Sequence, residues 1–184
     1  MKKYLLPSIR LTLVMLVLLC GFYFGVIYLV GKIAPGGGNG EQVVVNGKIA
    51  GYKLIGQKFT EDKYFWSRPS AVDYNAAGSA GSNKGPSNPD YLKIVSDRID
   101  TFMVHNPGIK KSEIPAEMVT ASGSGLDPDI SPASAYVQVA RISKIRNIDE
   151  SKVKSLVDQH IKQNPVGPDI INVLALNAAL DELK

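Results

Sequence analysis

The sequence is poor in the residues that build disulfides and transition-metal sites. It contains one cysteine, Cys20, and two histidines, His105 and His160, among 184 residues. A single cysteine cannot form a disulfide within the chain, and neither histidine stands in a His-Glu-x-x-His or Cys/His spacing. Because 45% of the residues are hydrophobic and 21% are charged, a wholly disordered or collagen-like chain is also excluded. The composition predicts one ordinary folded domain.

Acidic residues are absent from the first 40 positions of the chain. The first is Glu41, whereas Lys2, Lys3 and Arg10 precede a long uncharged segment. Those three residues account for most of the formal net charge of +4, because the rest of the chain carries 18 basic against 17 acidic residues. A nucleic-acid interface needs a basic stripe that neutralises several phosphates. The body of this chain has no such stripe, which argues against nucleic acid as a partner.

The uncharged segment covers residues 11–31. At about 1.5 Å per residue it forms a helix of about 31 Å, which is long enough to cross a bilayer core. A cleaved signal peptide would have an apolar region of only about 7–15 residues. A lipoprotein would carry small residues before the modified cysteine, whereas Val17-Leu18-Leu19 precede Cys20. We therefore favour a retained transmembrane helix over these two alternatives.

The basic residues at positions 2, 3 and 10 predict how this helix is oriented. Lys and Arg beside a span favour the cytoplasmic side, so we expect residues 1–10 in the cytoplasm and the main domain outside, in a periplasm or its equivalent.

Within the span, Gly21 and Gly25 are four positions apart and share one helix face. Glycines in this spacing let the backbone of a second helix approach closely, which makes both residues candidate partner contacts. The alternative is that glycine is simply frequent in membrane helices, and the two explanations are equally good on the sequence alone.

A change of composition follows the span. Residues 32–40 are rich in glycine and predict a flexible linker, so the extracytoplasmic domain should comprise residues 41–184. At its start, residues 42–45 and 48–55 predict two strands joined by Asn46-Gly47, a dipeptide that favours a type I′ hairpin turn.

The spacing of apolar residues predicts about four helices in the domain, which makes its fold class α+β. The expected helices begin after the caps Asn88, Ser131 and Asp149, and the last covers residues 170–183 after a brief strand. We also expect a short strand over 114–121, a long loop over 70–89, and burial of the aromatic run at 64–66.

Residues 122–132 form a glycine-rich turn, which we compared with catalytic and metal-binding motifs. Neither Ser122 nor Ser124 has a glycine two positions away on both sides, as the Gly-x-Ser-x-Gly pattern of a nucleophile elbow requires. Asp127 and Asp129 are separated by proline and have no further ligands at calcium-loop spacing, so a role in the turn and at the helix entry is the better interpretation. The sequence therefore gives no reason to assign a catalytic, cofactor-binding or metal-binding residue.

We predict instead that this turn is a structural and docking element. Its candidate residues are Ser122, Gly123, Ser124, Gly125, Asp127, Ser131 and Pro132. Gly123 and Gly125 should adopt backbone angles that other residues resist, and Ser131 with Pro132 should start the following helix.

Two classes of function suit a single-span protein with such a domain. The first is an accessory subunit of a membrane complex, which the absence of a recognisable catalytic motif favours. The second is an independent membrane-anchored envelope hydrolase, whose residues would come together only in the folded structure. Copurification with larger membrane subunits would support the first, and activity of the isolated domain would support the second.

A resemblance favours the first class. Residues 118–132, followed by Gln138-Val-Ala-Arg141, resemble the KdpC family, the C subunits of the bacterial potassium-transporting ATPase. Further blocks of likeness, in the order typical of the family, are residues 56–59, 64–70, 81–89 and 172–177. One departure is Asp129, where the family usually has histidine, so no imidazole role is carried over to this position.

The resemblance implies a non-catalytic subunit of an ATP-driven potassium importer in a bacterial inner membrane. Its implied partners are a channel-like potassium-selecting subunit, a P-type ATPase subunit and a small single-span subunit, and the complex as a whole handles ATP and potassium. Members are described as catalytic chaperones that raise the ATP affinity of the ATPase subunit. Because the predicted orientation keeps the domain away from cytoplasmic ATP, we expect a stabilising or potassium-access role instead.

Overall fold

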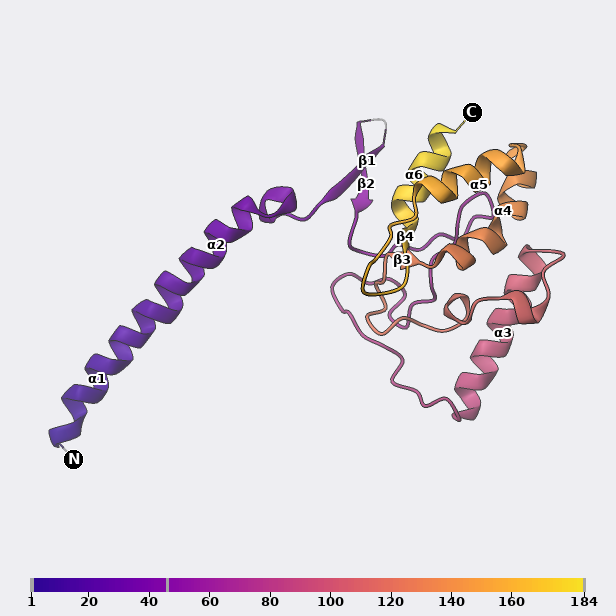
Figure 1. Cartoon of the computed structure of the whole chain (residues 1–184). Helices are drawn as coiled ribbons and strands as arrows, with labels where there is room; N and C mark the ends of the chain where they lie inside the picture. The colour runs from indigo at the N-terminus through magenta and orange to yellow at the C-terminus, as the bar shows by residue number, and fades with distance from the viewer. Residues whose placement is uncertain (1, 46, 184) are drawn as a thin grey trace. The chain divides into compact units, whose positions relative to one another are not determined.

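The computed structural model describes residues 2–45 and 47–183. It divides the chain into two compact units, Met1–Glu41 and Gln42–Lys184. Each unit has its own secondary structure, and each is described separately below (Figure 1).

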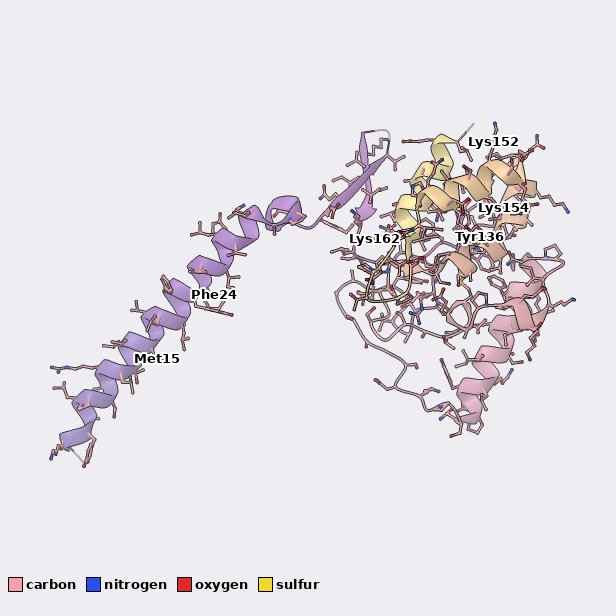
Figure 2. The ribbon with its side chains drawn as sticks, in the orientation of Figure 1. Met15, Phe24, Tyr136, Lys152, Lys154 and Lys162 are labelled. Atoms are coloured by element: carbon pink, nitrogen blue, oxygen red, sulfur yellow. The ribbon has the colours of Figure 1, made fainter. Side chains whose placement is uncertain are left out.

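The first unit is a helical run that becomes π-helical in its middle. Helix α1 covers Lys2–Leu16, the π-helical segment η1 covers Val17–Tyr23, and helix α2 covers Phe24–Ile33. Residues Lys3–Ile33 are long and apolar enough to cross a membrane, and their side chains project outward around the helix (Figure 2). The described part of the chain thus contains a single candidate transmembrane helix. Nothing in the apolar sequence pattern indicated the π-helical segment.

The expected linker contains an ordered turn. Residues Pro35–Gly38 form the short 3-10 helix η2, in which Gly36 and Gly37 have positive φ angles of 78° and 60°. These angles are readily adopted by glycine, which explains why a glycine-rich segment follows the helix.

The second unit begins with the expected hairpin. Strands β1, Gln42–Val45, and β2, Lys48–Tyr52, pair antiparallel with a register irregularity between Val43 and Val44. Strand β2 ends at Tyr52 rather than at residue 55, because the chain turns there and Ile55 N–H donates to the Tyr52 carbonyl at 3.1 Å. The predicted type I′ turn includes Asn46, which lies outside the described residues.

Four α-helices follow within the described residues of this unit, as expected. They are α3, Pro89–His105, α4, Pro132–Arg146, α5, Glu150–Gln159, and α6, Val173–Glu182. Asn88, Ser131 and Asp149 each accept a backbone hydrogen bond in the first turn of their helix, which confirms the three predicted caps. The α+β fold class is therefore confirmed.

The strand predicted over residues 114–121 is wrong. That segment instead contains the 3-10 helix η4, Ala116–Met118, and a second 3-10 helix, η3, Lys111–Glu113, directly precedes it. The Glu113 carboxylate accepts from Lys110 N–H at 2.8 Å, and Thr120 N–H bonds back to the Ala116 carbonyl at 3.0 Å. These local hydrogen bonds hold the segment in tight turns rather than in an extended conformation.

A two-residue strand pair lies beside the helices. Strand β3, Asp129–Ile130, pairs antiparallel with β4, Ile171–Asn172. The strand β4 confirms the brief strand that was expected before the last helix, whereas β3 was not predicted. The pair joins the predicted docking turn to the start of α6.

The hydrophobic core lies among the helices of this unit, where α4 packs on α5 and α5 packs on α6. Its fully buried side chains include Phe65, Ile130, Val139, Ile142, Val153, Val157, Ile171, Leu176 and Leu180. The hydrophobic effect of burying these side chains stabilises the domain.

An extended aromatic segment, residues 64–66, enters this core and is held there by amide side chains. Phe65 has no exposed surface, which confirms the expected burial at this position. Asn177 of α6 accepts from Phe65 N–H at 2.8 Å and donates to the Phe65 carbonyl at 3.0 Å. Gln138 of α4 accepts from Trp66 N–H at 2.8 Å. Two helices thus satisfy backbone groups that a neighbouring strand would otherwise pair.

Candidate functional site

The predicted docking turn, residues 122–132, is closed by its own serine hydroxyls. Ser122 is buried, and its Oγ accepts from Gly125 N–H at 2.9 Å. The Oγ of Ser124 accepts from Leu126 N–H at 3.1 Å. Both hydroxyls therefore satisfy backbone donors within the turn, as serine side chains commonly do in tight turns.

The two glycines of this turn have different roles. Gly125 has a φ angle of +69°, and a Cβ atom there would lie 2.7 Å from both the Ala80 carbonyl oxygen and Val72 Cγ2. Gly123 has no positive φ, and a Cβ atom there would meet nothing within 4 Å. The expectation of special backbone angles is correct for Gly125 and wrong for Gly123, because only the former is buried under a neighbouring segment.

That neighbouring segment is part of the long loop expected over residues 70–89. Ser70 Oγ donates to the Gly125 carbonyl at 2.6 Å, and Ser79 Oγ donates to the Ser124 carbonyl at 2.9 Å. Asp73 and Tyr74 in the same loop have left-handed backbones, with φ angles of 50° and 59°. Burial raises the pKa of the Tyr74 phenol to about 12. The first part of the loop is thus packed onto the turn.

An ion pair fixes the middle of the turn. Arg68 Nη1 lies 2.8 Å from Asp127 Oδ2, and both side chains are about one quarter exposed. The other carboxylate oxygen of Asp127 accepts from Asp129 N–H at 3.1 Å. Gly56 N–H donates to the Leu126 carbonyl at 2.8 Å, and this hydrogen bond attaches the segment that follows the hairpin to the turn.

The end of the turn starts helix α4 with the aid of Glu117. The Oγ of Ser131 accepts from Ser134 N–H at 3.2 Å, and Pro132 occupies the first helical position, as expected. The Glu117 carboxylate accepts from Ser131 N–H at 2.8 Å and from the Ser134 hydroxyl. Burial alone would raise the pKa of Glu117, but the hydrogen bonds from these two serines outweigh it and lower the pKa below its ordinary value of 4.5.

Asp129 belongs to strand β3 and faces a different neighbour. Asn172 Nδ2 donates to Asp129 Oδ1 at 3.3 Å and to the Lys53 carbonyl at 2.7 Å. Burial and the negative charge of Asp127 raise the pKa of Asp129. Among the described residues, no group of three or more His, Cys, Asp or Glu side chains is placed to hold a metal ion.

A second polar cluster, centred on Arg141 of α4, was missed at the sequence level. Arg141 is buried, and its guanidinium donates to Asn106 Oδ1 at 3.0 Å, to Gln138 Oε1 at 2.7 Å and to the Tyr64 carbonyl at 3.0 Å. The guanidinium also lies 4.8 Å from the centre of the Trp66 ring, and burial lowers its pKa to about 10. The signal was present in the Gln138-Val-Ala-Arg141 block, but spacing alone did not reveal its partners.

The two candidate glycines of the span are far from the turn in sequence and belong to the first unit. Gly21 lies in η1 and Gly25 in α2, and a Cβ atom at either would meet nothing within 4 Å. The open surface is compatible with close packing of another helix, which stays a prediction.

Comparison with known proteins gives a consistent result. The family described as "KdpC: K+-transporting ATPase, c chain" matches residues 5–182. A potassium-transporting ATPase KdpC subunit from Flavobacterium johnsoniae is 59% identical, over 99% of this chain and 100% of its own. Proteins of the same description from Bacteroides fragilis and Caldanaerobacter subterraneus are 51% and 45% identical, over 99% and 96% of this chain and 98% and 94% of their own.

The matched residues include the candidate span, the aromatic segment, the docking turn and all four helices of the domain. The resemblance first noticed at residues 118–132 is confirmed over nearly the whole chain. This chain belongs to the KdpC family of potassium-transporting ATPase subunits.

Proposed function

We propose that this chain is a non-catalytic subunit of an ATP-driven potassium importer, in which its domain stabilises the outer side of the complex or assists potassium access. The observation that carries the proposal is the family match from residue 5 to residue 182. The proposed partners are a channel-like potassium-selecting subunit, a P-type ATPase subunit and a small single-span subunit.

The chemistry of the turn supports a non-catalytic role. The hydroxyls of Ser122 and Ser124 accept backbone hydrogen bonds, and Asp127 is paired with Arg68. A hydrolytic nucleophile would instead be hydrogen-bonded to a general base. These polar groups are better suited to holding a surface in shape for a partner than to attacking a substrate.

The proposed location is the bacterial inner membrane, with the N-terminus in the cytoplasm and the domain outside. Lys2, Lys3 and Arg10 on one side of the candidate span support this orientation. The family description of a catalytic chaperone that raises ATP affinity then requires an indirect effect, since ATP is cytoplasmic. Such an effect would pass through the contacts between this subunit and its membrane partners.

Purification of the complex tests the proposal. The full-length chain, carrying an affinity tag at its C-terminus, should copurify with two larger membrane subunits and restore potassium-stimulated ATPase activity to a complex that lacks it. The chain alone should hydrolyse no ATP and no common ester or peptide substrate. Hydrolysis by the purified chain would instead favour an envelope hydrolase.

Cysteine labelling tests the orientation. In a Cys20→Ser background, Ser82→Cys should react with a membrane-impermeant maleimide added to intact spheroplasts. Ser8→Cys, on the predicted cytoplasmic side, is the matched control and should react only after the membrane is opened. The reverse pattern would refute the orientation.

A further inference from the structure

The hairpin has one face that packs on the domain and one that does not. Its inner face lies against α6, where a Cβ atom at Gly51 would be 3.1 Å from Leu174 Cδ2. On the outer face, Val44 and Ile49 are cross-strand partners and are 58% and 61% exposed. Tyr52, at the other end of β2, is 41% exposed. We call Val44, Ile49 and Tyr52 the outer hairpin face.

This face would be unusual on a strand surrounded by water. Antiparallel sheets with one solvated face generally carry polar side chains there. The cross-strand pair of Val44 and Ile49 has the opposite character, although the exposed Gln42 stands opposite Tyr52 at the other end of the ribbon. The outer hairpin face therefore has the composition of a contact surface.

The covalent chain limits where this face can be. Only residues 34–41 separate the end of helix α2, at Ile33, from the start of strand β1, at Gln42. Fully extended, the nine steps from Ile33 to Gln42 span at most about 30–32 Å, whatever the orientation of the two units. Since the candidate span ends at Ile33, the hairpin starts within that distance of the end of the span.

The linker is in fact far from extended. Residues Pro35–Gly38 form the turn η2, and a Cβ atom at Gly38 would lie 3.3 Å from the carbonyl oxygen of Gly31, inside α2. A Cβ atom at Gly36 would lie 2.8 Å from the backbone nitrogen of Glu41. The linker thus folds back on the end of the helix, and the residue bonded to Gln42 lies close to the turn.

We propose that the outer hairpin face rests on the interface of the bilayer that the chain's own helix crosses. Aliphatic side chains at this depth leave water, and tyrosine is favoured there because its ring is apolar and its hydroxyl is polar. Lys48, exposed beside the tip of the hairpin, can pair with the phosphates of anionic lipids in the leaflet that it faces. The hairpin is then a second, shallow membrane contact, which restricts how far the domain can tilt from the membrane.

Fluorescence quenching in vesicles tests this contact on the full-length chain. In a Cys20→Ser background, Val44→Cys and Ile49→Cys are labelled separately with an environment-sensitive NBD probe. The protein is reconstituted into vesicles of phosphatidylethanolamine and phosphatidylglycerol, with or without lipids that carry a spin-label quencher near the headgroup. Ser96→Cys, exposed on α3, is the control, because α3 lies on the other side of the domain from the hairpin (Figure 1).

The expected result is a blue-shifted emission at positions 44 and 49 in vesicles, with loss of intensity when the quencher lipid is included. The probe at position 96 should show neither change, and an unchanged far-ultraviolet circular dichroism spectrum shows that each variant is folded. Three results would overturn the proposal. In the first, the emission of the probes at positions 44 and 49 stays that of a probe in water. In the second, the emission shifts only when the protein is concentrated in detergent, which indicates contact with a second copy. In the third, it shifts only when the larger subunits are added.

Discussion

Replacement of Gly125 by alanine is the most direct test of the docking turn. The residue has a φ angle of +69°, and the added Cβ would lie 2.7 Å from the Ala80 carbonyl oxygen and from Val72 Cγ2. Gly123→Ala is the matched control, because it adds the same atom in the same turn where nothing lies within 4 Å. Comparing the two variants therefore separates the effect of backbone strain and crowding from the effect of merely replacing a glycine by alanine.

The magnitude follows from two contributions. A left-handed backbone costs a residue with a Cβ atom about 1–2 kcal/mol. Forcing an extra carbon into a filled space costs about 1–3 kcal/mol more, since the Ala80 carbonyl is backbone and cannot rotate away. Gly125→Ala should thus lower the free energy of unfolding by about 2–5 kcal/mol, whereas Gly123→Ala should change it by no more than about 0.5 kcal/mol.

Urea unfolding of the full-length chain in mild detergent measures this difference. The only tryptophan, Trp66, lies in the domain and packs on Phe102, so its fluorescence reports unfolding of the domain without interference from the membrane helix. The two glycine variants are compared with the unmodified chain at equal detergent concentration. Equal losses in both variants, or no loss in Gly125→Ala, would refute the strain argument.

Three further predictions concern the turn, its carboxylate and the span. Ser122→Ala and Ser124→Ala should retain potassium-stimulated ATPase activity in the assembled complex, although Ser122→Ala should lose about 1–3 kcal/mol of stability because a buried N–H loses its acceptor. The pKa of Glu117 is lower in the folded protein than its ordinary value of 4.5, so the ionised carboxylate stabilises the fold fully above pH 4.5. This stabilisation is lost as the pH falls through the folded-state pKa. Thermal melts should therefore depend less on acid pH in Glu117→Gln than in the unmodified chain. Gly21→Leu with Gly25→Leu should reduce copurification with the partner subunits, and full recovery would count against the glycine contact.

The local features of the fold could be predicted from the sequence. Asn88-Pro89, Ser131-Pro132 and Asp149 mark helix starts because capping depends on residues within one turn of each other. The strand predicted over 114–121 was wrong because local hydrogen bonds also decide the conformation of that segment. Its apolar residues fit a strand, but short-range hydrogen bonds such as that of Thr120 favour turns.

The contacts that shape the candidate site could not be predicted. The pair of Arg68 and Asp127, and the pair of Glu117 and Ser134, join segments whose spacing follows no motif. The difference between Gly123 and Gly125 likewise depends on Ala80, which only the folded structure brings near. Sequence patterns identified the right segment as a turn. The role of each residue in it depends on contacts with segments that are distant in the sequence.

The hydrogen bonds between the Asn177 side chain and the Phe65 backbone have a consequence for how the protein is made. The two residues are 112 positions apart, and Asn177 belongs to the last helix of the chain. Until that helix has been synthesised, the Phe65 backbone lacks these partners, and the buried Phe65 ring has no complete pocket. Contacts between such distant segments slow folding, because a long loop must close before they form. The domain should therefore complete its folding only after α6 has been synthesised, and deletion of α6 should yield a chain that is degraded rather than a smaller stable domain.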